Sequence, residues 1–207
     1  MYFESIGLVR VSAHEDIGFS PALIFTKVGS DEKLLEAYVH SDWQSLDDDH
    51  PGMNPQLRFT VRRIKGFPSP LVIAVSMSPG GSDDAWESFA VAAIKGQLEQ
   101  LNYEHLQTND DGGFFFGDLG NGIGLGAAQW NFVWGETESH PPPHRYEIKL
   151  YKWNGRRFEW EKVMRTRAQY NCAHDAVRAY GFPYTDVRAS FPEWEYLGDW
   201  REMCNEH

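Results

Sequence analysis

The stretch from Gly112 to Val163 reads GGFFFGDLGNGIGLGAAQWNFVWGETESHPPPHRYEIKLYKWNGRRFEWEKV and carries the clearest β-sheet pattern in the chain. Residues two apart lie on one face of a strand. One such set is small at its start and aromatic at its end: Gly120, Gly122, Gly124, Gly126, Ala128, Trp130, Phe132 and Trp134. Glycine weakens a strand interior. The pattern therefore predicts a bulged strand, or two strands joined by a turn near Asn121 and Gly122.

The second half of this stretch predicts a β-hairpin. Apolar residues alternate from Tyr146 to Leu150, and the pair Asn154-Gly155 favours a tight turn. Phe158, Trp160 and Val163 then indicate the return strand.

Other short apolar or alternating segments outside this stretch predict further strands, at 6–11, 21–28, 34–39, 57–64 and 70–75. Segment 86–101 fits two structures. It reads as a hairpin broken at Gly96, or as a helix, since its apolar residues also form a helical stripe. Near the C-terminus, Asn171 is expected to cap a short helix that ends at Gly181.

The order of strands suggests an internal repeat. Units 5–50, 56–102 and 103–166 each run through about four strands, and Trp43, Leu98 and Phe158 recur at spacings close to the length of a propeller blade. We therefore expect a mainly β protein with one domain over 1–207. Its antiparallel sheets would form about three four-stranded, propeller-like units, and residues 168–207 would form a short helical cap over an otherwise open edge. The alternative is an α+β fold with a helix at 86–101.

The segment YEIKLYKWNGRRFEW, at 146–160, resembles the outer hairpin of the VCBS or FG-GAP class of β-propeller repeats. The resemblance covers residues 112–163 and implies a propeller blade there. The family's alternating aspartate loop is replaced by Asn109-Asp110-Asp111-Gly112 and Asp118-Leu119-Gly120-Asn121-Gly122, so calcium binding is not expected. Known propellers have typically four or more blades. Three units would instead pair with another chain, as in a homodimer, or pack as a curved stack or sandwich.

Composition narrows the class of partner. The 207 residues are 42% hydrophobic and carry a formal net charge of −11, which disfavours nucleic acid and anionic membrane surfaces and allows a basic protein partner. No window approaches the run of about 18 apolar residues that a spanning helix needs. The two cysteines, Cys172 and Cys204, do not form a disulfide framework, so we expect a reducing, cytoplasmic setting.

Three chemical candidates follow from the motifs. Gly122-x-Gly124-x-x-Ala127 fits a relaxed dinucleotide fingerprint, but the aromatic and proline-broken sequence after it makes a poor helix. Cys172 with His174 near a helix start suggests a nucleophile, against a buried thiol. The best metal-like cluster contains Glu136, Glu138, His140 and His144.

These observations favour a non-catalytic, acidic protein-binding or inhibitory module, similar in role to an immunity protein. Its expected binding residues are Trp130, Trp134, Glu136, Glu138 and Trp153, because buried aromatics rimmed by charge make interface hot spots. No cofactor is expected for this role. One alternative is a metal-dependent hydrolase that uses His140 or His144 with the acidic residues of the 136–144 loop. Another is a carbohydrate-binding β protein that stacks sugars on Trp and Tyr.

Overall fold

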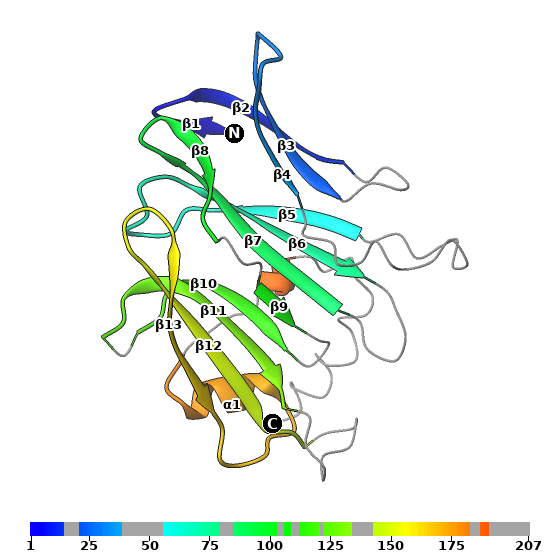
Figure 1. Cartoon of the computed structure of the whole chain (residues 1–207), viewed down its shortest axis with the longest axis vertical. Helices are drawn as coiled ribbons and strands as arrows, with labels where there is room; N and C mark the ends of the chain where they lie inside the picture. The colour runs from blue at the N-terminus through cyan, green and yellow to red at the C-terminus, as the bar shows by residue number, and fades with distance from the viewer. Residues whose placement is uncertain are drawn as a thin grey trace, which may run out of the picture. The chain divides into compact units, whose positions relative to one another are not determined.

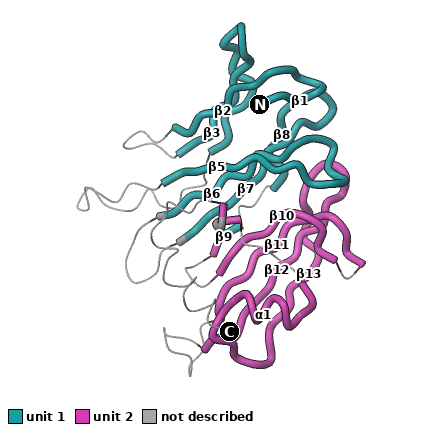
Figure 2. The backbone as a smooth tube through the Cα atoms, turned by 180° about the vertical axis from the view of Figure 1, so that it is seen from behind, with its two compact units in different colours: residues 1–107 teal, residues 108–207 magenta. Residues whose placement is uncertain are grey.

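The computed structural model describes residues 1–14, 21–38, 56–78, 85–102, 106–108, 112–120, 122–133, 143–182 and 187–190. In this part of the chain the strands form three antiparallel sheets, accompanied by one α-helix and one 3₁₀ turn (Figure 1). The contacts divide the chain into two compact units, Met1–Gln107 and Thr108–His207 (Figure 2). The single domain expected from the sequence stays a prediction, since two compact units can belong to one domain or to two.

The first sheet lies in unit 1 and is a simple meander in the order β1-β2-β3-β4. The strands expected over 6–11, 21–28 and 34–39 are all present. Their bounds are β1 (Tyr2–Phe3), β2 (Gly7–His14), β3 (Ala22–Lys27) and β4 (Lys33–Tyr38).

The second sheet, also in unit 1, has the order β5-β6-β7-β8, and β9 pairs with β7. The bounds are β5 (Gln56–Arg62), β6 (Leu71–Ser78), β7 (Ala85–Ile94), β8 (Gln97–Gln100) and β9 (Leu106–Thr108). Segment 86–101 is thus a hairpin turning at Lys95 and Gly96, which both have positive φ. The helical alternative is wrong. Its apolar stripe arises because β7 is a central strand that buries residues on both faces, Ala90 and Val91 included.

Unit 1 is held together by a core shared between its two sheets. Phe3, Val9, Leu23 and Phe25 come from the first sheet, and a matching set comes from the second: Leu57, Val72, Ala74, Phe89, Val91, Ala93 and Leu98. All these residues are buried. Two antiparallel sheets therefore pack face to face around one apolar layer.

The third sheet lies in unit 2 and is again a meander, β10-β11-β12-β13. Its strands are β10 (Gly113–Asp118), β11 (Leu125–Phe132), β12 (Tyr146–Trp153) and β13 (Phe158–Arg165). The glycine-rich stretch forms two strands with a turn between them, which confirms the second of the two alternatives predicted from the sequence. Leu119 N donates to Gly124 O at 2.8 Å, and Ile123 N donates to Gly120 O at 2.9 Å. Positive φ at Gly120, Gly122 and Gly124 makes this reversal possible.

One face of the third sheet is covered by helix α1 (Ala173–Ala179), and η2 (Val187–Ser190) follows it. Ala176 and Val177 of α1 join Trp130, Ile148 and further residues in one core cluster. The expected helical cap is present, but it lies on a face of the sheet, where it contacts β11 and β12, and not on an edge. Its N-cap residue is Cys172, without a side-chain hydrogen bond, so Asn171 does not cap it.

The established architecture is mainly β, with three antiparallel sheets of four or five strands. The division into repeat units 5–50, 56–102 and 103–166 stays a prediction, and β9, which falls in the last of these units, pairs with β7 of the second sheet. No helix among the described residues is long and apolar enough to cross a membrane.

Candidate binding surface

The hairpin of β12 and β13 is shaped by its turn. Asn154 Oδ1 accepts hydrogen bonds from the backbone N–H groups of Arg156 and Arg157, both at 2.9 Å. Gly155 has a φ of +98°, which favours glycine. The Asn-Gly turn expected from the sequence is therefore present, and it fixes which residues of the two strands face each other.

Four cross-strand pairs place one set of side chains on the sheet face opposite to α1. We call this set the outer strip. It consists of the pairs Glu147 and Arg165, Lys149 and Val163, Tyr151 and Trp160, and Trp153 and Phe158. The register shifts by one residue between Leu150 and Tyr151, so Glu161 is extra and Val163 stays on the same face as Trp160.

The side chains of the outer strip are less exposed next to the turn than further along β13. Phe158 is 5% exposed, Trp153 is half-buried, and Trp160 and Val163 are 56% and 44% exposed. Next to Phe158, the β10 side chain of Phe116 is buried, with the two ring centroids 5.7 Å apart. The exposed indole thus stands at the end of a packed aromatic row and is not an isolated surface residue.

Two ring contacts hold the aromatic side chains in place. Tyr151 and Trp160 have centroids 6.0 Å apart and planes at 78°, and Trp153 and Phe158 have centroids 5.5 Å apart at 61°. Edge-to-face pairs of this kind contribute about 0.5–1.5 kcal/mol beyond buried area. The contact with Tyr151 limits the rotamers that Trp160 can adopt, which lowers the entropy lost when a partner covers it.

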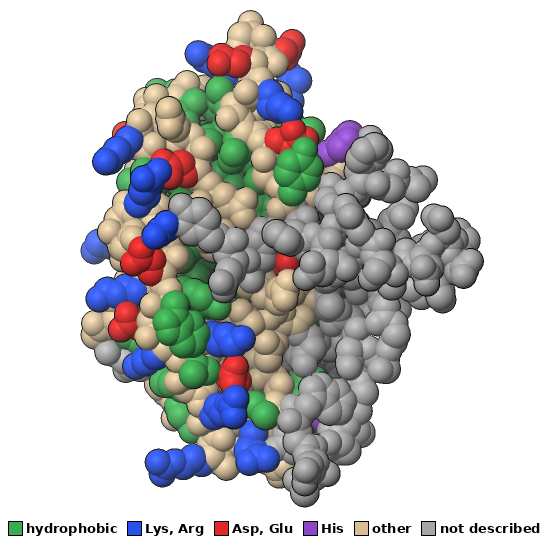
Figure 3. All heavy atoms as spheres, in the orientation of Figure 1, with side chains coloured by type: hydrophobic (Ala, Val, Ile, Leu, Met, Phe, Trp, Pro, Cys, Tyr) green, Lys and Arg blue, Asp and Glu red, His purple; other side chains and the backbone are tan. Residues whose placement is uncertain are grey.

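Charged side chains flank the aromatic residues of the strip. Glu147 accepts from Arg165 Nε at 2.8 Å and lies 3.8 Å from Lys149 Nζ, so one carboxylate meets two cations. At the turn, Arg157 Nε pairs with Glu159 at 3.1 Å. Figure 3 shows hydrophobic side chains among Lys and Arg side chains over this hairpin. An apolar centre with a charged rim is the usual anatomy of a protein interface.

The edge of β13 is less suited to binding than its face. Among the described strands only β12 pairs with β13. The bulge at Glu161 and the exposed charges of Glu159 and Lys162 are the devices by which proteins prevent a further strand from pairing at an edge. We therefore place the candidate surface on the outer strip and not on the backbone of β13.

The structure separates the binding residues expected from the sequence. Trp130 is 2% exposed and packs in the core under α1, so its indole is not accessible to a partner. Trp153 belongs to the outer strip and is half-buried. Trp134, Glu136 and Glu138 lie outside the described residues.

Of the expected metal ligands, only His144 is described, while His140 lies outside the described residues. His144 is fully buried, stacks on Phe132 with a centroid distance of 4.5 Å, and forms a β-bridge with Tyr170. Within the described part of the chain, no three His, Cys, Asp or Glu side chains are grouped to hold a metal ion. A site in the 136–144 loop stays a prediction.

Cys172 does not have the free thiol that nucleophilic catalysis needs. It is disulfide-bonded, and it is buried at the start of α1. The chain's other cysteine, Cys204, lies outside the described residues. The expectation of a nucleophile at Cys172 with His174 is therefore wrong, as is its alternative of a buried thiol. A disulfide also removes the argument for a reducing compartment, because such bonds persist mainly in oxidising ones.

Among the described residues, the pKa values that are clearly shifted belong to one surface group, formed by Lys33, Glu36 and Tyr38. The bond from the Lys33 ammonium holds the pKa of Glu36 below its ordinary value, and the Tyr38 hydroxyl acts in the same direction. The same contact with Glu36 raises the pKa of Lys33, and a hydrogen bond with Glu36 raises that of Tyr38. All three groups are solvated on β4, so water screens the pairing. This group resembles a surface ion pair more than a catalytic site.

From the sequence, Trp160 was expected in the return strand of the hairpin and had no predicted role. A signal was present in the sequence. Tyr146, Ile148 and Leu150 are the apolar set of β12, so Lys149 and Tyr151 must point to the other face, where Tyr151 pairs with Trp160.

Comparison of the chain with protein-family models, curated proteins and solved structures finds no match.

Proposed function

We propose that the chain is a non-catalytic binding module that holds a protein partner on the outer strip of the β12–β13 hairpin. The observation that carries this proposal is the exposed indole of Trp160, supported by Tyr151 on a preformed sheet. Trp, Tyr and Arg are the residues most enriched at interface hot spots, and the strip contains all three types. The proposal keeps the binding role expected from the sequence and moves it from Trp130 to Trp160.

Rigidity supports this role. The indole belongs to a strand whose register is fixed by a tight turn and by seven cross-strand pairs. Aromatic side chains supply a large contact area at a small cost in conformational entropy. Burying the exposed part of such a side chain is worth on the order of 1–2 kcal/mol from area alone, and a pocket in the partner would add contacts.

The propeller-like arrangement of the three sheets is also part of this proposal. Each sheet has the meander order of a propeller blade. The resemblance of residues 112–163 to VCBS or FG-GAP repeats supports the same arrangement. Repeats of this kind act as scaffolds that present loops and strand faces to other molecules, which agrees with a role in binding.

The test compares Trp160→Ala with Tyr2→Ala. Tyr2 is an aromatic residue of similar exposure, at 60%, on a different sheet, so it controls for the loss of any surface ring. A partner captured from the source cells by the wild-type chain is purified and its affinity for each variant is measured by calorimetry. We expect Trp160→Ala to weaken binding at least tenfold, or about 1.4 kcal/mol, and Tyr2→Ala to leave it unchanged. Equal affinity of the wild type and Trp160→Ala contradicts the proposal.

A further inference from the structure

The hairpin that carries the outer strip is basic, although the whole chain is strongly acidic. Residues 145–167 contain eight Lys and Arg residues and three Glu residues, a formal excess of five positive charges, against a net charge of −11 for the chain. The basic residues are Arg145, Lys149, Lys152, Arg156, Arg157, Lys162, Arg165 and Arg167. From this contrast we infer that the partner held on the outer strip presents an acidic surface, an inference that rests on the proposed function. It replaces the basic partner that the net charge allowed.

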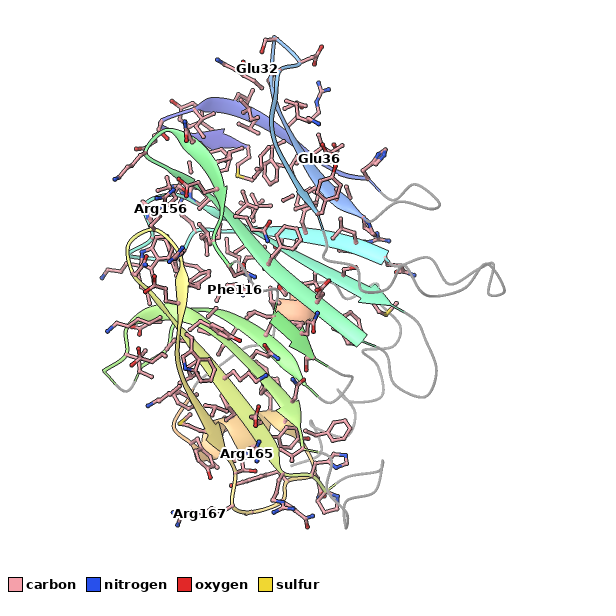
Figure 4. All side chains as sticks on the ribbon, viewed as in Figure 1. Glu32, Glu36, Phe116, Arg156, Arg165 and Arg167 are labelled. Atoms are coloured by element: carbon pink, nitrogen blue, oxygen red, sulfur yellow. The ribbon has the colours of Figure 1, made fainter. Side chains whose placement is uncertain are left out.

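The cations lie at both ends of the aromatic row. Figure 4 shows Arg156 at the turn end of the hairpin, and Arg165 and Arg167 at its open end. With about 3.3 Å per residue, β13 separates these ends by roughly 20 Å. Carboxylates on either side of an apolar hollow that accepts the indole of Trp160 would match this arrangement.

The ion pairs within the hairpin do not neutralise all of its positive charge. Glu147 is shared by Lys149 and Arg165, so this group keeps one net positive charge on the strip face. Arg167, at the open end of the hairpin, is exposed and forms no ion pair with another described residue. Lys152 and Lys162 are also exposed, but they lie on the other face of the two strands, since Lys162 pairs with Leu150. The field of Arg167 and of the Glu147 group reaches about 8 Å at physiological salt, which favours the approach of an acidic surface to the strip.

Two other occupants fit this surface less well. A second copy of the chain, related by a two-fold axis, would bring the same basic hairpin against itself, and like charges at a contact oppose association. A single-stranded nucleic acid stacks its bases on ring faces and needs a positive groove along its backbone. Here Tyr151 and Trp160 stand edge to face, and the net charge of the whole chain repels a long polyanion. A protein that is acidic only over the contact area avoids both difficulties.

The experiment uses a display library of random peptides, selected on the immobilised full chain. Two variants resolve the roles of ring and charge: Trp160→Ala, and Arg156→Glu combined with Arg165→Glu. Arg156→Lys with Arg165→Lys is the matched control, because it keeps the charge. Circular dichroism checks that each variant retains the β-sheet spectrum. Binding of a fluorescent oligothymidylate is measured beside the peptides.

We expect the selected peptides to be richer in Asp and Glu than the starting library. Their affinity should fall at least tenfold with Trp160→Ala and with the double Glu variant, fall with added salt, and persist with the double Lys variant. Neutral or basic peptides that still require Trp160 would overturn the acidic partner and leave the proposed function standing. Tighter Trp160-dependent binding of the oligothymidylate would assign the strip to a nucleic acid and overturn both. Failure to enrich peptides, or enrichment indifferent to Trp160→Ala, counts against both as well.

Discussion

Trp160 of β13 stands edge-on against Tyr151 of β12, with ring centroids 6.0 Å apart and planes at 78°, and more than half of the indole faces solvent. The same sheet buries another tryptophan, Trp130, on its opposite face under α1. The two indoles therefore belong to one sheet and have different roles. Trp130 supplies core packing, whereas Trp160 leaves apolar surface exposed, which is why we propose it as a contact for a partner.

This difference predicts that truncation of the two residues lowers stability by unequal amounts. Trp130→Ala removes a fully packed ring and should lower the free energy of unfolding by about 3–5 kcal/mol. Trp160→Ala removes an exposed ring, so we expect a loss of about 1 kcal/mol or less. Urea denaturation followed by circular dichroism measures both. Equal losses for the two variants would mean that the assignment of sheet faces is incorrect.

A second prediction concerns Gly126 in β11. A Cβ atom there would lie 2.1 Å from the backbone oxygen of Tyr151 and 2.6 Å from Leu119 Cδ1, so the sheet itself would have to move. Gly126→Ala should cost about 3 kcal/mol, at the upper end for overpacking. At Gly120 a Cβ meets open space, and the cost comes only from its φ of +64°. We expect about 1–2 kcal/mol for Gly120→Ala and a smaller loss for Gly120→Asn, measured by the shift in thermal midpoint.

The strands were predictable where one face is buried or where turn residues flank a short apolar run. Segment 57–64 alternates and forms β5, and Asn154-Gly155 marks the turn of the β12–β13 hairpin. The ambiguous segment was β7, because a central strand that is buried on both faces has no alternation to separate it from a helix. The disulfide at Cys172 was not predictable, since pairing depends on distances that only the fold sets.

The third prediction tests Asn102, a buried side chain that joins two backbone groups of β7. Its Oδ1 accepts from Ala90 N at 2.9 Å, and its Nδ2 donates to Ser88 O at 3.2 Å. Asn102→Leu leaves both groups unsatisfied and should cost about 2–6 kcal/mol, at 1–3 kcal/mol for each group.

Asn102→Asp supplies the control for this pair of hydrogen bonds. The ionised carboxylate can accept from Ala90 N but repels Ser88 O, whereas the protonated acid can donate to it. The pKa of the new carboxyl should therefore be raised in the folded state. The stabilisation from the hydrogen bond that the protonated acid donates is fully present below the unfolded pKa of the new carboxyl, and it is lost as pH rises through the folded pKa. Denaturation in mild acid and at neutral pH measures the difference, and a pH-independent loss would contradict the bonding scheme.

The fourth prediction concerns the titration of Glu36. Its pKa is lowered chiefly by the hydrogen bond from Lys33, so Lys33→Ala should raise it toward the ordinary value of a glutamate. The stabilisation from this pair is present above the unfolded pKa of Glu36 and is lost as pH falls through the lower folded pKa. Carboxyl NMR shifts across an acid titration give the pKa of Glu36 in the wild type and in Lys33→Ala. An unchanged pKa in Lys33→Ala would show that Tyr38 dominates the shift.

The proposed binding surface was harder to predict from sequence than the fold, and the bulge in β13 shows why. Counting every second residue from Phe158 places Lys162 on the same face as Trp160, whereas the extra residue Glu161 brings Val163 there instead. Aromatic content alone also did not distinguish Trp130 from Trp160. Only the position of α1 decides which face of the sheet is inside, and that position depends on packing between distant segments.

The last prediction addresses Cys172 chemically. Because this residue is disulfide-bonded, its peptide should resist alkylation by iodoacetamide in denaturant and become modified only after reduction. Mass mapping of digests with and without reductant measures this, and the amount of alkylation after reduction is the internal control. The bond also fixes the residue at the start of α1, so reduction should lower the free energy of unfolding by about 2–4 kcal/mol, the usual range for a native disulfide. Full alkylation without reductant would mean that the thiol is free, and the expectation of a reducing compartment would then regain its basis.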